Sequence, residues 1–429
     1  MPEAWDPPSP PAPLSETPGK FALDIQPLRA VIDQPVEIKV RGVAANETVV
    51  MRAWTEGASG LRFESWARFV ADKQGIVDTA VLAPLEGTYR DADGSGLLWS
   101  MRAPDAEVYE SSSMPQARYY VSAETTNGVV EVALTRINPR FQILSQTIST
   151  EFVDGQFWLP ESAETLPAVI RLHGSEGAFN PTRSALLASS GFAVLDLRFV
   201  DPVGLPEIVA VPVETVQRGI DWLVQHPRVD AARIGIYGGS KGAELALYAA
   251  AKDPRIRAVV AWSPASHAFE GVSFRELTPG SSWSWQGNPT AYAPFRIEGS
   301  EVLRHLIRLL FRNVSMLPIY ERTLNLAPPE SAIQVEEISG AILLLAGRDD
   351  RMWPSARMAA ILDERLTDNH HPNHEIVLYD NTGHRMRYAL WPDLHQPSRI
   401  VGGGRPEQNH ASGRDAWRRI KEFLRRELR

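Results

Sequence analysis

The chain has 429 residues, a formal net charge of −8 and no cysteine, and 44% of its residues are hydrophobic and 22% charged. These values are typical of a globular protein, and the length favours two domains. They exclude disulfides, thiolate metal ligands and a cysteine nucleophile, they argue against a nucleic-acid-binding surface, and no stretch approaches the ~20 apolar residues of a membrane span.

Residues 1–19 are rich in proline and contain no apolar core. They predict a flexible, partly extended arm rather than a signal peptide. The absence of cysteine suits a reducing compartment, and no targeting signal is recognised, so a cytoplasmic protein is expected. The oligomeric state cannot be read from the sequence.

Residues 20–138 predict an all-β domain, a sandwich of immunoglobulin-like type. Apolar and polar residues alternate in short runs, and two longer runs meet at Asn127-Gly128, the strongest short hairpin signal. The turn at 91–96 has acidic residues at alternate positions but lacks the bidentate glutamate of a calcium loop, so an ordinary loop is expected. The alternating runs are 36–42, 47–54, 62–71 and 118–137.

Residues 139–429 predict a second domain with a doubly wound, mostly parallel sheet. Nearly continuous apolar runs alternate with helical patterns, which is typical of strands covered by helices on both faces. The expected strands are 167–174, 192–200, 233–239, 257–265, 341–347 and 374–380, and the expected helices include 215–227, 241–253, 355–366 and 415–428.

Ser240 lies between a predicted strand and a predicted helix, with Gly238 two residues before it and Gly242 two residues after it. This is the G-x-S-x-G pattern of a nucleophile elbow, in which a sharp, strained turn exposes the serine hydroxyl at the carboxyl edge of an α/β-hydrolase sheet. The pattern predicts Ser240 as a catalytic nucleophile.

A serine nucleophile needs a base that a third group orients, and in this fold the acid and then the histidine follow the serine along the chain. Asp350 follows the strand at 341–347 and His384 follows the strand at 374–380, so these residues are the predicted acid and base. Asp349 is the alternative acid, although we expect it to cap the loop or pair with Arg351.

Acyl transfer also needs two backbone N–H donors for the developing oxyanion. We expect one from Lys241 and the other from the loop after the strand at 167–174, at Ser175 or Glu176. His173 in that loop is expected to be a hydrogen-bonded structural residue. The three histidines between 370 and 374 are expected in an exposed loop rather than a zinc site, and no metal is predicted.

Several residues near the expected site are candidates for binding substrate. Arg385 and Arg387 flank His384, and with Lys241 they could attract an anionic substrate such as a phosphate-bearing thioester. The alternative is that the arginines pair with acids such as Asp380 or Asp393. Trp283 and Trp285 lie in a segment, 266–335, that is expected to roof the pocket, where aromatic residues either line an acyl tunnel or simply pack.

The sequence resembles the family of acyl-CoA thioesterases related to bile acid-CoA:amino acid N-acyltransferase, which join an immunoglobulin-like domain to an α/β-hydrolase. The resemblance covers "PVEIKVRGVAANETVVMRA", "GTYRDADGSGLLWSM", "IGIYGGSKGAELAL", "ILLLAGRDDRMWPS", "YDNTGH" and "VGGGRPEQNHASGRDAWRRIKEFLRREL". It implies Ser240 as nucleophile, Asp350 as acid and His384 as base. Members of the family that conjugate amino acids typically use cysteine, so serine implies thioester hydrolysis. Where the family usually has an apolar run after the histidine, this chain has "RMRYALWP".

The expected function is therefore hydrolysis of acyl-CoA or related acyl thioesters by a serine hydrolase without a metal or redox cofactor. One alternative is transfer of the acyl group to an amine or alcohol. Another is an ester or amide hydrolase that does not use CoA, and a non-enzymatic adhesion or scaffold role would require the triad geometry to be absent. The acyl chain cannot be read from the sequence.

Overall fold

The computed structural model describes residues 8–103, 114–162, 164–200, 207–271, 279–297, 314–385, 387–389 and 401–429. The chain divides into two compact units, the first formed by Met1–Phe141 with Arg387–Pro397 and the second by Gln142–Met386 with Ser398–Arg429. The sequence places the boundary between residues 138 and 139, and the structure places it between Phe141 and Gln142.

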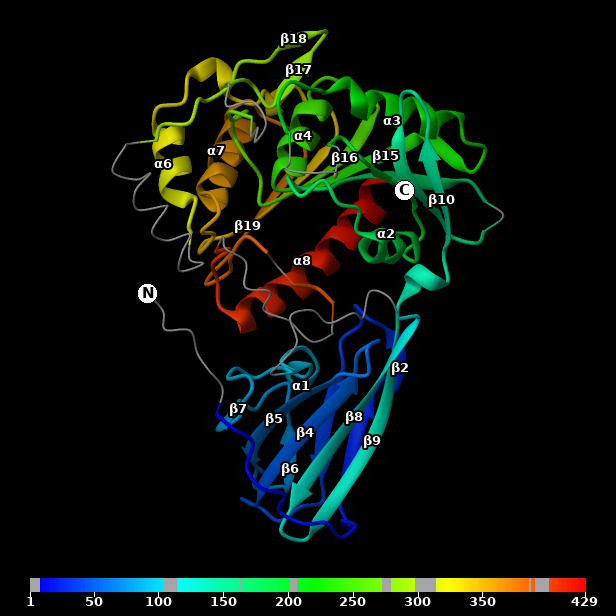
Figure 1. Cartoon of the computed structure of the whole chain (residues 1–429), viewed down its shortest axis with the longest axis vertical. Coiled ribbons are helices and arrows are strands. Elements are labelled where there is room, and N and C mark those ends of the chain that lie inside the picture. The colour runs from blue at the N-terminus through cyan, green and yellow to red at the C-terminus, as the bar shows by residue number, and fades with distance from the viewer. Residues whose placement is uncertain are drawn as a thin grey trace. The chain divides into compact units, whose positions relative to one another are not determined.

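The first unit consists of two β-sheets that share one hydrophobic core (Figure 1). Strands β1-β3-β6 form the smaller sheet and β2-β9-β8-β4-β5-β7 the larger one, with neighbours antiparallel except β2 and β9. The predicted sandwich is thus confirmed. The elements are β1 (Ala22–Gln26), β2 (Arg29–Val31), β3 (Glu37–Arg41), β4 (Thr48–Glu56), β5 (Arg62–Val70), β6 (Ile76–Asp78), β7 (Glu86–Gly87), α1 (Gly96–Trp99), β8 (Gln116–Thr125) and β9 (Gly128–Ile137).

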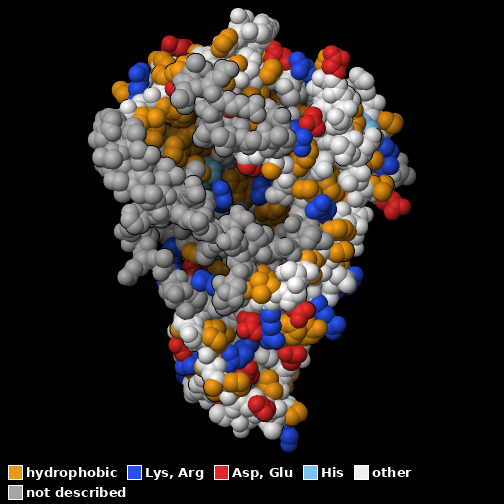
Figure 2. Space-filling view, in the orientation of Figure 1, with side chains coloured by type: hydrophobic (Ala, Val, Ile, Leu, Met, Phe, Trp, Pro, Cys, Tyr) orange, Lys and Arg blue, Asp and Glu red, His pale blue; other side chains and the backbone are white. Residues whose placement is uncertain are grey.

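The alternation of the sequence explains this packing. Ile38 and Val40 on β3 are fully buried between the sheets, whereas the charged residues that alternate with them are partly or fully exposed. The hairpin predicted at Asn127-Gly128 joins β8 to β9, with Thr125 paired opposite Gly128. Figure 2 shows acidic and basic side chains interspersed over this unit, and several form ion pairs, such as Arg52 with Glu124.

The described part of the proline-rich arm makes hydrogen bonds to the larger sheet, and its flexibility stays a prediction. The indole N–H of Trp66 donates to the Pro8 carbonyl (3.1 Å) and Arg52 Nη2 donates to the Pro11 carbonyl (2.7 Å). Further along, Gly19 N–H donates to Val129 O on β9. Carbonyl groups in a proline-rich segment find few backbone donors locally, so donors on the sheet hold them.

The second unit is built on an eight-stranded sheet in the order β10-β11-β13-β12-β15-β16-β19-β20 (Figure 1). Strands β13, β12, β15, β16, β19 and β20 run parallel to one another, and β10 and β11 add an antiparallel edge. This confirms the predicted α/β-hydrolase fold. The strands are β10 (Leu144–Ser149), β11 (Asp154–Leu159), β12 (Leu166–Leu172), β13 (Ala193–Leu197), β15 (Val229–Gly239), β16 (Ile256–Trp262), β19 (Ala341–Gly347) and β20 (His374–Tyr379).

Helices cover both faces of this sheet. In Figure 1, α2 and α8 lie on one face and α3, α4 and α7 on the other. Apolar side chains of the last helix are buried, and Leu424 and Leu428 pack closely on Gly235 of β15, where an added Cβ would lie 3.0 Å from Leu428. The helices are α2 (Pro181–Ala188), α3 (Glu214–Gln225), α4 (Lys241–Ala250), α7 (Ser355–Asp368) and α8 (Pro406–Glu427).

Smaller elements lie between β13 and β19 in the chain. They are β14 (Val211–Pro212), β17 (Trp283–Trp285), β18 (Asn288–Pro289) and α6 (Leu317–Asn325). An aromatic cluster that includes Phe269, Tyr320 and Trp353 packs there. The pocket roof predicted over 266–335 falls partly outside the described residues. Within the described part of the chain, no helix is long and apolar enough to cross a membrane.

Candidate active site

Ser240 occupies a strained turn between β15 and α4. Its φ is +57° and its ψ is −125°, a left-handed backbone that non-glycine residues rarely adopt, and its side chain is half-buried. A Cβ at Gly238 would lie 2.1 Å from the Gly242 carbonyl oxygen, and a Cβ at Gly242 would lie 2.2 Å from the His173 carbonyl oxygen. The sharp turn and its need for both glycines are therefore as the sequence predicts.

Asp350 and His384 are joined by a hydrogen bond from His384 Nδ1 to Asp350 Oδ2 (2.8 Å), and both side chains are buried. The same carboxylate accepts bonds from the amides of Met352 (2.8 Å) and Trp353 (3.2 Å) and from Ser355 Oγ (2.6 Å). With Nδ1 as the donor, His384 Nε2 is left as the free acceptor, which is the state that a general base requires.

A short path of hydrogen bonds connects the turn at Ser240 to the loop of His384. Ser240 N–H donates to the Trp262 carbonyl at the end of β16 (2.9 Å), and the next residue, Ser263, donates from Oγ to the His384 carbonyl (3.2 Å). Among the described residues no hydrogen bond joins the Ser240 hydroxyl to the His384 ring. Such bonds are often long without substrate and tighten in the substrate complex.

Asp349 lies beside Asp350 but has different partners. Its Oδ2 accepts the Gly404 amide (2.9 Å), and its Oδ1 lies 3.3 Å from Arg351 Nε. This is the capping and pairing role expected for it. The two adjacent aspartates therefore have different roles: Asp350 bonds the ring of His384, and Asp349 bonds the amide of Gly404.

Three consecutive glycines, 402–404, hold the loops of the acid and the base. The carbonyl of Gly402 accepts from the amides of His384 (2.8 Å) and Arg351 (3.2 Å), and Gly403 and Gly404 have φ values of +82° and +73°. A Cβ at Gly403 would lie 1.8 Å from the Asp349 carbonyl oxygen. A residue with a Cβ therefore fits at position 403 only if the loop of Asp349 moves.

We expect Gly403→Ala to lower the free energy of unfolding by at least about 3 kcal/mol, because the collision with Asp349 adds to the backbone strain. Gly287→Ala is the matched control, since Gly287 has a φ of +77° but no atom within 4 Å of the added Cβ. The control should lose only about 1 kcal/mol. Denaturant unfolding curves measure both, and equal losses would show that the contact with Asp349 is not restrictive.

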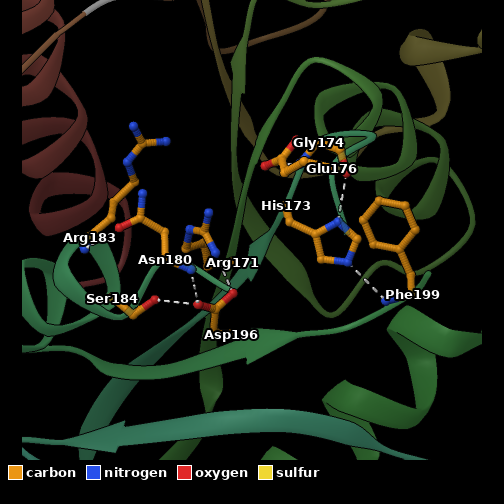
Figure 3. A network of polar contacts seen from close by, with 9 residues as sticks. All are labelled: Arg171, His173, Gly174, Glu176, Asn180, Arg183, Ser184, Asp196 and Phe199. Atoms are coloured by element: carbon orange, nitrogen blue, oxygen red, sulfur yellow. Dashed lines mark hydrogen bonds and ion pairs between the residues drawn. The ribbon is translucent and has the colours of Figure 1, made fainter. Parts of the chain in front are cut away.

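The loop after β12 is fixed by His173, which is fully buried (Figure 3). Its Nδ1 donates to the Gly174 carbonyl (2.7 Å), its Nε2 accepts the Phe199 amide (3.2 Å), and its ring stacks on Phe199 at 4.0 Å. Burial lowers the pKa of His173, so the neutral ring is retained. The structural role expected for this histidine is confirmed.

Ser175 and Glu176 are exposed in the same loop, next to the close approach of His173 to Gly242. The Glu176 carboxylate turns back and accepts the Gly174 amide (3.1 Å). Below the loop, Arg171 pairs with Asp196, whose other oxygen accepts from Ser184 Oγ at 2.9 Å (Figure 3). This buried network ties β12, β13 and α2 together beneath the loop.

Lys241 does not present its charge to a substrate, so that part of the prediction is wrong. Its ammonium is buried and lies 2.7 Å from Glu244 Oε2. Burial lowers the pKa of Lys241 and the Glu244 carboxylate counteracts this. Trp283 is also fully buried and donates from Nε1 to Glu244 Oε1 (2.8 Å), which corresponds to the packing alternative rather than to a tunnel wall.

The other candidate residues lie nearer to solvent. Trp285 is half-buried and packs against the core of the second unit. Arg385 is exposed and makes no hydrogen bond or ion pair with the residues that the structure describes, while Asp380 pairs with Arg348 (3.1 Å). Arg387 is exposed and belongs to the first unit, and Asp393 lies outside the described residues.

The histidines of residues 370–374 do not form a metal site. His371 Nε2 bonds the Ile338 carbonyl (2.8 Å), and His374 Nε2 lies 3.4 Å from Asp363. No group of three or more potential metal ligands occurs in the part of the chain that the structure describes.

Four residues at the site were not identified from the sequence: Glu244, Ser263, Ser355 and Asn409. Glu244 is a lone acid in an otherwise small and apolar helix, three residues after Lys241, and that charge pattern is a usable signal. Asn409 bonds Gly383 and Gly403 from the first turn of α8, and like Ser263 it acts on residues far along the chain, whereas Ser355 lies only five residues after its partner Asp350.

A parallel sheet with a strained serine turn, and an acid and a histidine on later strand ends, defines an α/β-hydrolase. Residues 211–429 match the model described as BAAT / acyl-CoA thioester hydrolase C terminal, and residues 33–144 match the acyl-CoA thioester hydrolase/BAAT N-terminal region. The chain belongs to this family of hydrolases.

Similar proteins span almost the whole chain. Acyl-coenzyme A thioesterase 6 of Mus musculus is 27% identical over 426 residues, covering 95% of this chain and 96% of that protein. Mitochondrial acyl-coenzyme A thioesterase 2 of Rattus norvegicus is 27% identical over 451 residues, covering 99% and 95%. Among solved structures, a puromycin-hydrolyzing peptidase of Mycobacterium tuberculosis is 14% identical with a TM-score of 0.44, covering 87% of this chain and 53% of that chain.

Proposed function

We propose that this protein hydrolyses acyl-CoA thioesters with Ser240 as nucleophile, His384 as base and Asp350 as the group that orients the base. The observation that carries the proposal is the bond from His384 Nδ1 to Asp350, in a loop tied through Ser263 to the strained turn of Ser240. Family membership and the thioesterase relatives support the substrate class.

In the proposed reaction, Ser240 Oγ attacks the thioester carbonyl while its proton passes to His384 Nε2. The oxyanion receives N–H bonds from Lys241 and from Ser175 or Glu176. The C–S bond then breaks, and the imidazolium returns its proton to the leaving thiolate. Water attacks the acyl-serine ester while His384 Nε2 takes its proton, the bond between the acyl carbon and Ser240 Oγ then breaks, and the imidazolium returns the proton to Oγ as the free acid leaves. Asp350 stabilises the imidazolium without accepting its proton.

The test is release of free CoA from acyl-CoA substrates of graded chain length by the purified full-length protein. Thiol release by wild type from at least one substrate, and its loss in Ser240→Ala, is the expected result. A wild type that releases no thiol from any member, yet cleaves simple esters, would favour the ester hydrolase alternative. Products formed with added glycine, taurine or an alcohol would favour acyl transfer.

Arg385 and Arg387 remain as exposed cations suited to an anionic carrier, since Lys241 is buried and paired. We expect Arg385→Ala to raise KM for a CoA thioester about 10-fold, with kcat little changed and a weaker salt dependence of KM. A short uncharged ester should be unaffected. Arg387→Ala tests the second arginine in the same assays. Arg348→Ala, which removes an exposed arginine paired with Asp380, is the matched control. Equal changes on both substrates would assign Arg385 a structural role.

Location stays a prediction. The names of related proteins include mitochondrial and peroxisomal thioesterases, and we retain a cytoplasmic location as the proposal for this chain. Fractionation of the native source with compartment markers tests it.

A further inference from the structure

The first turn of α4 contains a buried ion pair that the proposed reaction does not use. Lys241 Nζ and Glu244 Oε2 are 2.7 Å apart, and the two side chains are 4% and 0% exposed. Removing two charges from water costs several kcal/mol per ion, so a buried pair contributes little to net stability compared with apolar residues. Its position, one residue after Ser240, suggests a different role.

The other oxygen of Glu244 holds two more groups. Oε1 accepts the Trp283 indole N–H (2.8 Å) and the Phe269 amide (3.1 Å). The Lys241 ammonium also lies 5.2 Å from the centre of the Trp283 ring, within range of a cation–π contact. One carboxylate therefore binds the first turn of α4, the segment after β16 and strand β17.

The same cluster reaches the loop after β12, the second expected source of an oxyanion donor. The Trp283 ring is 5.9 Å from Phe199, which stacks on His173 at 4.0 Å. The carbonyl of His173 is where a Cβ on Gly242 would collide, so this loop touches the turn itself. Both expected sources of oxyanion donors, the Lys241 amide and the loop after β12, are thus braced by one set of contacts.

We propose that Glu244, acting through Lys241 and Trp283, is a positioning residue that fixes the Lys241 backbone N–H toward the developing oxyanion. This inference rests on the proposed function, in which that N–H is an oxyanion donor. Anchoring the Lys241 side chain restricts rotation of the peptide between Ser240 and Lys241. A small change in the direction of the Lys241 N–H lowers the rate strongly, because displacing a catalytic group by about 1 Å can cost 10²-fold in rate.

The test compares Glu244→Gln, Lys241→Met and the double variant in the full-length protein. Each single variant leaves one buried charge unpaired, so Tm should fall and kcat should fall about 10- to 100-fold, with KM within about 2-fold of wild type. The double variant removes both charges, and its glutamine oxygen still accepts from Trp283 and Phe269. Its Tm should recover toward wild type while kcat stays low, because the anchor is absent.

A purely structural role predicts the opposite pattern, in which kcat recovers together with Tm in the double variant. That result would overturn the proposal. Glu422→Gln and Arg418→Met are the matched controls, because this pair is exposed on α8 (2.6 Å apart) and should change neither kcat nor Tm appreciably.

The affinities of two inhibitors measure how well the Lys241 N–H stabilises an oxyanion. A trifluoromethyl ketone with the preferred acyl chain forms a hemiketal oxyanion on the serine, whereas the matching acyl-CoA thioether only occupies the substrate site. In Glu244→Gln, the Ki of the ketone should rise in proportion to the loss of kcat, and the Ki of the thioether should stay within about 2-fold. A ketone Ki that does not change would overturn the proposal.

Measurements on the wild-type protein distinguish failure of the positioning role of Glu244 from failure of the proposed function. If the ketone does not add to Ser240 in wild type, the proposed nucleophile is wrong and no variant is needed to show it. If it adds to Ser240 but the variants bind it as tightly as wild type, only the positioning role fails.

Discussion

Replacing Ser240 with alanine is expected to lower kcat at least about 10⁴-fold, because the hydroxyl that forms the acyl-enzyme is removed. Stability should be retained or slightly altered, since Ser240 Oγ makes no hydrogen bond with the described residues and the strained backbone remains. Thiol release under saturating acyl-CoA measures the effect, and circular dichroism shows that the fold is intact.

The control for this variant is Ser189→Ala, which removes an exposed hydroxyl at the end of α2 that donates to the Leu186 carbonyl. It should leave kcat unchanged. A fluorophosphonate probe adds a second criterion, since it should label Ser240 in wild type and nothing in Ser240→Ala. Labelling of another serine together with full activity would refute Ser240 as the nucleophile.

Asp350→Asn is expected to lower kcat about 10⁴-fold through the orientation of the histidine. The amide of asparagine can place its NH₂ against Nδ1 of His384, which favours the tautomer with the proton on Nε2. That nitrogen then cannot accept the serine proton. The Met352 and Trp353 amides favour this orientation, because they already donate to Oδ1 and keep the carbonyl oxygen on their side.

Asp349→Asn is the matched comparison, because it makes the same chemical change one residue away. Its bonds go to Gly404 and Arg351, so kcat should fall by less than about 10-fold. Steady-state kinetics of the two variants measure the contrast. If Asp349→Asn were the more damaging change, the assignment of Asp350 as the orienting acid would fail.

The turn at Ser240 could be predicted because its determinants are local. Gly238 and Gly242 fall within five consecutive residues, between a buried strand and a helix, and the collision that Gly238 avoids is with Gly242 itself, whereas Gly242 avoids His173 of another loop. The order of the later strands likewise follows from apolar runs. Asp350 and His384 could be placed at strand ends, although only the structure brings their side chains to 2.8 Å.

Features that depend on distant partners could not be predicted in this way. The sequence predicts a flexible arm over residues 1–19 because this segment is rich in proline and has no apolar core, and it gives no indication that donors on Trp66 and Arg52 bind carbonyls of the arm. Lys241 reads as a free cation because lysines usually reach solvent, yet Glu244 and Trp283 enclose it. The donors that bind the arm and the indole of Trp283 lie on other elements and are not encoded by local spacing, whereas Glu244 follows Lys241 by three residues on the same helix and could have been read from the sequence.

The glycines that hold the base loop have a consequence for the order in which the protein becomes active. The chain is synthesised from its N-terminus, and domains fold as they emerge. All eight strands of the large sheet are complete by Tyr379, but Gly402, Gly404 and Asn409 have still to be translated at that point. A nascent chain can therefore hold a finished sheet with the Ser240 turn while His384 has no fixed position. Hydrolytic activity that depends on His384 would then arise only once α8 has docked.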